Sequence, residues 1–73
     1  MKITVDIVSP PDREKLVAQI SCDCEQWAEI HQEKKELTLE IYPRQDGQPW
    51  TLSYDESLAA LLLAKTRLVD DSK

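Results

Sequence analysis

The most constraining feature of the sequence is a pair of alternating segments on either side of Asp46-Gly47. Apolar side chains recur at every second position through most of 37–43 and 48–54, with polar or hydroxyl-bearing side chains between them. A period of two is typical of strands that bury one face, and Asp-Gly is a strong hairpin turn. The sequence therefore predicts two antiparallel strands joined by a tight turn.

A third segment, 24–32, fits the same sheet. An even-length turn after it sets Ile30 opposite Leu39 and Ala28 opposite Ile41, all on the apolar face. Because a slip of one residue would reverse every side chain, this agreement indicates a third strand. A helix is the alternative, since the segment is rich in residues with high helix propensity.

Two further elements precede these strands. Residues 2–8 alternate like a strand that is half buried. Residues 10–20 are predicted to form a helix, because Ser9-Pro10-Pro11-Asp12 combines a serine that can cap with proline at the first helical position. Leu16, Val17 and Ile20 give this helix a narrow apolar stripe.

The last predicted element is a helix over 55–69, capped by Ser53 or Asp55. Its apolar positions form a wide face that is expected to cover the sheet. Leu62 is central to that face and is predicted to be buried. Residues 70–73 are expected to fray.

Together these elements predict the α+β class. The expected architecture is a two-layer sandwich with the order β-α-β-β-β-α, a mostly antiparallel four-stranded sheet and both helices on one face. The first strand and the 24–32 strand are expected to be parallel neighbours, joined by a right-handed crossover. Residues 1–69 then form one domain. Many unrelated functions use this architecture, so the fold alone predicts none.

Size and charge restrict the function classes. The chain has 73 residues, with 14 acidic and 9 basic side chains and a net charge of −5. Such a chain repels phosphate backbones and anionic membranes, because its basic residues are scattered. A thin core leaves little room for an enzyme cavity, so we expect no catalytic residues and no cofactor. A basic surface on another protein is the expected partner. Without a targeting segment in view, the expected compartment is the cytoplasm.

The face of the sheet without helices carries the candidate binding residues. Aromatic and acidic side chains alternate there, and the register sets Glu29 opposite Glu40. Like charges directly opposite one another destabilise a sheet unless they are needed for something else. An aromatic pair beside two carboxylates suits a basic side chain such as arginine. The candidates are Trp27, Glu29, His31, Glu40, Tyr42 and Ser53.

A small-ligand or metal site is the alternative. It would use Cys22, Cys24 and His31, or the carboxylates of Glu29 and Glu40. Structural zinc needs four ligands, whereas the cysteines and the histidine supply three at most. We therefore expect no metal, with one cysteine buried and the other in a loop.

In size and charge the chain is similar to small acidic α+β domains such as toxin-neutralising immunity proteins and other inhibitors. The leading hypothesis is accordingly a non-catalytic protein-interaction module, whether inhibitor, immunity-like or accessory protein. An exposed edge strand could also pair with a second copy of the chain to form a dimer.

Overall fold

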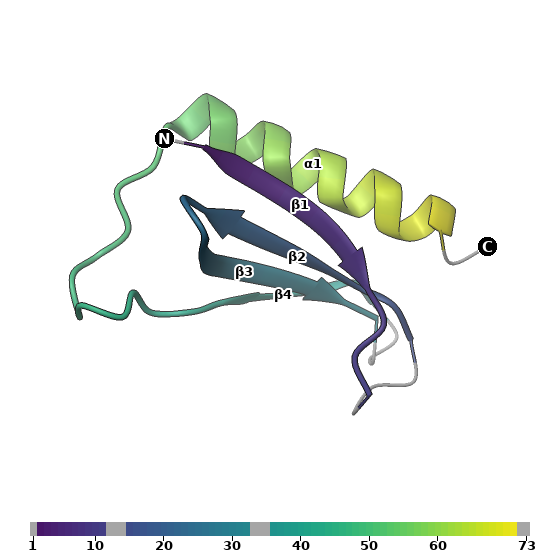
Figure 1. The fold of residues 1–73 in the computed structure, drawn as a ribbon. Helices are drawn as coiled ribbons and strands as arrows, with labels where there is room; N and C mark the ends of the chain where they lie inside the picture. Colours follow the sequence, from purple (N-terminus) through teal and green to yellow (C-terminus); the bar gives the residue numbers. More distant parts are fainter. Residues whose placement is uncertain (1, 12–14, 33–35, 72–73) are drawn as a thin grey trace.

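A computed structural model describes residues 2–11, 15–32 and 36–71. In these ranges four strands precede one helix. The elements are β1 (Ile3–Val8), β2 (Val17–Cys22), β3 (Glu25–His31), β4 (Thr38–Ile41) and α1 (Tyr54–Asp71). The strands form one antiparallel sheet in the order β1-β2-β3-β4, and α1 packs along one face against β1 and β2 (Figure 1). The α+β class is confirmed, and the order is β-β-β-β-α.

The predicted helix over 10–20 is wrong, because residues 17–22 form the central strand β2. Both neighbours of β2 are antiparallel, so no parallel crossover joins β1 to the strand at 25–31. Val17 and Ala18 face opposite sides of β2, and both are fully buried. A strand that is buried on both faces lacks clear alternation, so its apolar residues can also be arranged as a helical stripe. The expected capping residue Asp12 lies outside the described residues.

β2 and β3 are joined by a tight turn at Asp23 and Cys24, whose φ angles are +51° and +71°. Positive φ at both central residues is the condition of the type I′ hairpin turn. The turn also fixes the start of β1. The Asp23 amide donates to the Lys2 carbonyl at 2.9 Å, and the Lys2 amide donates to Asp23 Oδ1 at 2.8 Å.

The predicted register of the next pair of strands is confirmed. Ala28 lies opposite Ile41, and Ile30 lies opposite Leu39. The strand interpretation of 24–32 is therefore correct, and the helical alternative is wrong. The hydrophobic pattern specified this register because one face of β3 is buried in the core.

The predicted strand over 48–54 is wrong. Residues 48–53 pair with no strand in the described part of the chain, and α1 begins at Tyr54. A turn does form at Asp46-Gly47, with Gly47 at a φ of +76°, but it is not a hairpin between two strands. Pro49 lacks the amide that a ladder needs. Trp50 is instead held by its indole nitrogen, which donates to the Tyr42 carbonyl at 2.7 Å.

α1 confirms the predicted C-terminal helix, but the side chains that it buries differ from the prediction. Ala60, Ala64 and Leu68 face the sheet, whereas Leu62 is 66% exposed. The prediction that Leu62 is buried is therefore wrong. The alanines, one turn apart, let the helix approach the sheet closely and so select the buried stripe. The helix extends through Asp71, and residues 72–73 lie outside the described part.

Candidate protein-binding surface

The predicted binding face is more covered than the sequence suggested. Trp27, Glu29 and His31 are only 7%, 6% and 3% exposed. The expectation of an open face is wrong for these three residues, because β3 is a central strand. Glu29, for example, lies between Gln19 of β2 and Glu40 of β4. Whether the predicted residues bind a partner remains a prediction.

Trp27 is buried because the β2–β3 ladder contains an irregularity. Ile20 pairs with Ala28, but the next residue, Ser21, pairs with Gln26. Trp27 is therefore the extra residue of a β-bulge, and bulges redirect side chains. Its side chain belongs to the hydrophobic core, while its carbonyl still accepts a hydrogen bond from the Tyr42 amide at 2.8 Å.

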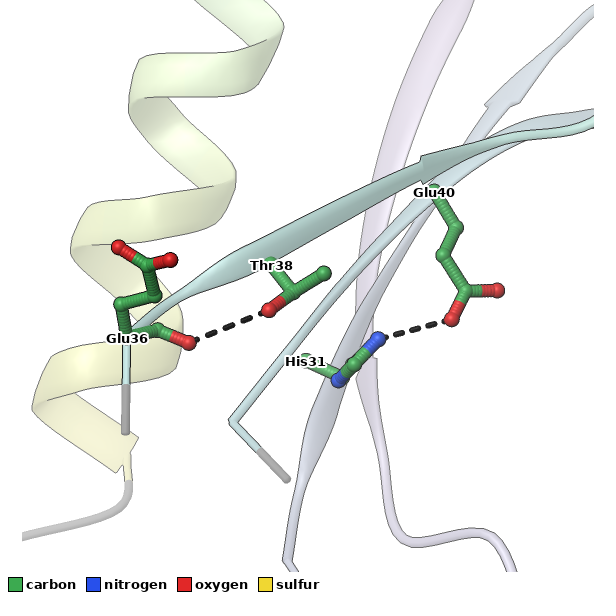
Figure 2. A network of polar contacts seen from close by, with 4 residues as sticks. All are labelled: His31, Glu36, Thr38 and Glu40. Carbon is green, nitrogen blue, oxygen red and sulfur yellow. Dashed lines mark hydrogen bonds and ion pairs between the residues drawn. The ribbon is translucent and has the colours of Figure 1, made fainter. Parts of the chain in front are cut away.

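His31 and Glu40 form a close polar pair on this face. The predicted pairing of Glu29 with Glu40 is confirmed, and His31 lies opposite Thr38. The diagonal contact, from His31 Nε2 to Glu40 Oε1, measures 2.8 Å (Figure 2). A carboxylate that orients an imidazole is a common arrangement in acid–base chemistry. Here, however, the ring is buried, while the Glu40 side chain is 44% exposed.

The strand containing Glu40 begins with a local hydrogen bond. The Thr38 hydroxyl donates to the Glu36 carbonyl at 3.2 Å, at the first residue of β4 (Figure 2). The Thr38 side chain lies on the helix-free face of the sheet, so this hydrogen bond does not involve the apolar side chains of β4 on the other face. It helps to define where the short edge strand starts.

The other two candidates lie outside the centre of this face. Tyr42 follows β4 and is half buried. Ser53 does not face Glu40. Its hydroxyl instead accepts a hydrogen bond from the Glu56 amide at 3.3 Å, and its carbonyl accepts one from the Ser57 amide at 2.9 Å. Ser53 is therefore the N-cap of α1, as one of the two predicted alternatives had it.

A cluster that the sequence reasoning missed lies beyond the β2–β3 turn. The guanidinium carbon of Arg44 lies 5.5 Å from the centroid of the Trp50 ring, which is cation–π geometry. The guanidinium also contacts Asp46 at 3.1 Å. Glu25 accepts a hydrogen bond from the Gln45 amide at 2.7 Å. These contacts hold the connection from β4 to α1 against the end of the sheet.

One cysteine is buried and the other is exposed, but the buried one is Cys22, whereas Cys24 of the predicted strand lies in the β2–β3 turn. Burial raises the pKa of the Cys22 thiol, and the nearby negative charge of Asp23 adds to this effect. Among the described residues, no three histidine, cysteine, aspartate or glutamate side chains lie together as a metal site would require.

Most of the exposed large apolar side chains in the described part of the chain are on α1. We define the helix flank as Leu58, Leu62 and Val69, which are 48%, 66% and 37% exposed. At about 100° per residue, the apolar positions of α1 cover roughly 260° of its circumference, more than twice what one sheet contact needs. That excess width was visible in the sequence and is the signal that could have revealed this surface.

A shallow groove connects the helix flank to β4. Its volume is about 210 Å³, and it is lined by Ile30, Leu37, Thr38, Leu39, Leu61 and Lys65. Lys65 also lies beside Leu62 and Val69, so the groove and the flank are continuous. On β4 itself, Leu39 and Ile41 are 43% and 59% exposed.

Comparisons with known proteins return no family model, no curated protein and no solved structure that matches the chain. In the described part of the chain, α1 is not long and apolar enough to cross a membrane.

Proposed function

We propose that the protein is a non-catalytic protein-interaction module of the cytoplasm and that it binds a partner through the helix flank. The observation that carries this proposal is the exposure of Leu58, Leu62 and Val69 on one side of α1. Small soluble proteins rarely leave contiguous apolar surface open, and such surface commonly marks an interaction site. The proposal keeps the class of function expected from the sequence but moves the site from the sheet to the helix.

The spacing of the helix flank favours a helical partner. Leu58, Leu62, Lys65 and Val69 follow one another at steps of four, three and four residues. This is the spacing at which one helix presents a continuous seam to another. Lys65 fits such a seam because its aliphatic stem can cover apolar surface while its ammonium stays in water. An amphipathic helix laid along the flank is therefore the partner that fits.

The acidic residues around the helix flank favour a partner with basic residues beside its apolar stripe. Asp55 and Asp70 are exposed on α1, and Asp70 lies beside Leu62 and Val69. The net charge of −5 adds a long-range attraction for a basic protein. Lysine or arginine beside the apolar stripe of the partner would be steered towards the flank, and added salt would weaken association.

The burial of His31 supports a non-catalytic role. The His31–Glu40 pair is the arrangement here that most resembles acid–base machinery, yet the ring is 3% exposed. A general base must come within hydrogen-bond reach of the proton that it removes. In this conformation a substrate does not reach the ring, so the pair fits a structural role better.

The test compares two identical substitutions on different sides of α1. Leu62 lies on the helix flank, whereas Leu63 is 50% exposed and lines a separate hollow beside Ile3 and Val5. A partner is first captured with wild-type protein, purified and titrated. We expect Leu62→Lys to weaken binding at least tenfold, by roughly 1.4 kcal/mol or more, and Leu63→Lys to leave it nearly unchanged. Equal effects of the two substitutions, or affinity that rises with salt, would contradict the proposal.

A further inference from the structure

The outer edge of β4 presents unpaired backbone groups. The Tyr42 amide donates to Trp27 of β3, so the backbone of Tyr42 faces β3. Because hydrogen-bonding direction alternates along an antiparallel strand, Thr38 and Glu40 face β3 as well. Leu39 and Ile41 therefore direct their amides and carbonyls outward. β4 is the last strand in the sheet order, and none of the described residues forms a strand beyond it.

The side chains of this edge do not protect it. Proteins commonly blunt an exposed edge strand with charged residues, with proline, or by covering it with another element. Leu39 and Ile41 are instead apolar and are 43% and 59% exposed. Both point to the face that carries α1, since their partners Ile30 and Ala28 belong to the core. An apolar, unprotected edge is a template for another strand.

The sequence of β4 matches a second copy of itself in one antiparallel register. Centred on Leu39, that register sets Leu39 opposite its own copy and Leu37 opposite Ile41 on the apolar face. On the other face it sets Thr38 opposite Glu40. Neighbouring registers are worse because like charges lie directly opposite. A centre at Glu40 pairs two Glu40 side chains, and a centre at Thr38 pairs Glu36 with Glu40.

We propose that β4 pairs with β4 of a second copy of this chain, forming an antiparallel dimer centred on Leu39. The contact is isologous, so it closes at two chains and does not propagate. Roughly six hydrogen bonds can form between the outward backbone groups of residues 37, 39 and 41. Each copy carries a net charge of −5, so added salt should strengthen the dimer by screening its self-repulsion. Binding of a basic partner to the helix flank has the opposite salt dependence.

The first test is sedimentation equilibrium over a concentration and salt series. We expect a monomer–dimer equilibrium that shifts towards dimer in salt. Leu39→Lys places like charges opposite one another at the centre of the register and should raise the dissociation constant roughly tenfold or more. Leu39→Val retains the apolar contact and the amide and should dimerise like wild type. Ala59→Lys adds the same charge at an exposed position on α1 and controls for net charge.

A cross-linking test fixes the register and does not depend on the stability of any disruptive variant. In a Cys24→Ser background, Leu39→Cys treated with oxidised glutathione as the electron acceptor should form a disulfide-linked dimer, because hydrogen-bonded antiparallel partners lie about 5.5 Å apart at Cα. Ile41→Cys alone should not cross-link, since its partner is Leu37. The mixture of Ile41→Cys with Leu37→Cys should do so.

Two results overturn the proposal. One is a monomer at every concentration and salt level. The other is a dimer that is insensitive to Leu39→Lys or that cross-links most readily through Ile41→Cys alone. Neither result affects the helix flank, whose partner binding is read from Leu62→Lys against Leu63→Lys. The two proposals therefore fail separately.

Discussion

The two edge strands of the sheet, β1 and β4, differ in the contacts made at their outward-facing sides. At β1, the Arg67 guanidinium donates to the outward carbonyl of Val5 at 2.9 Å. β4 is the last strand of the sheet formed by the described residues. Its exposed side chains, Leu39 and Ile41, are apolar. A side chain of α1 thus reaches one edge, whereas the described residues leave the other edge available to a second chain.

The cause of this difference is the width of the sheet. Strands about 4.8 Å apart set the outer two of four roughly 14 Å from one another, whereas a helix is about 10 Å wide. One helix therefore cannot cover the full width of the sheet. The buried alanines of α1, Ala60 and Ala64, form a stripe that places the helix over β1 and β2. From there Arg67 reaches the β1 edge. The apolar surface of β4 and of the helix flank lies on the uncovered side.

The largest expected effect separates the buried side of α1 from the exposed side. Leu68 is fully buried, so Leu68→Ala should cost about 2–5 kcal/mol of unfolding free energy. Leu62 is 66% exposed, so Leu62→Ala should cost no more than about 0.5 kcal/mol. Urea denaturation measures both values. Similar costs would show that α1 does not pack by its alanine stripe.

The next effect tests why α1 lies over β1 and β2. Ala64 is fully buried against the sheet, so Ala64→Leu should force the helix outward and cost about 1–3 kcal/mol. Ala59→Leu adds the same volume at an exposed position and should be nearly neutral. Thermal unfolding compares them. If Ala64→Leu proves as stable as the control, close approach of the helix is not what positions α1.

A smaller effect is expected where Arg67 closes the β1 edge. Arg67→Ala leaves the Val5 carbonyl to water, which should cost about 1 kcal/mol or less at this exposed site. Arg67→Met keeps the aliphatic contact and separates packing from hydrogen bonding. Denaturant unfolding of the two variants decides the matter. Unchanged stability in both would mean that the guanidinium contributes nothing at this edge.

The smallest effect concerns the turn that holds the end of β1. Cys24 has a φ of +71°, a conformation that costs a residue with a Cβ about 1 kcal/mol and glycine much less. Cys24→Gly should therefore stabilise the protein by about 0.5 kcal/mol once the greater chain entropy of glycine is included. Asp23→Gly removes the bond to the Lys2 amide and should not stabilise. A loss of stability in Cys24→Gly would contradict the type I′ turn.

The sequence predicted the strand register that depends on apolar residues alternating along one face. The β3–β4 register followed from Ala28 and Ile30 against Ile41 and Leu39, because one face of each strand is apolar. β2 was misread because Val17 and Ala18 are buried on opposite faces, which removes the alternation. A strand that is buried on both faces is recognised by a continuous apolar run, and Gln19 and Ser21 interrupt that run in β2.

The candidate site was predicted less well, for a related reason. Trp27 was expected on the open face, but a bulge in the β2–β3 ladder redirects it into the core, and alternation cannot anticipate an inserted residue. Leu62 was expected in the core because α1 has more apolar positions than one sheet can bury. Which of them are buried depends on the alanines, whose role becomes clear only once the helix and the sheet are placed together.

The difference between the two edges is tested most directly by backbone amide NMR over a concentration series of the wild-type protein. We predict that the amides of Leu39 and Ile41 shift with rising concentration and exchange more slowly with solvent, while those of Val5 and Ile7 in β1 stay unchanged. Concentration-dependent changes at β1 with none at β4, or no change at either edge, would contradict the account.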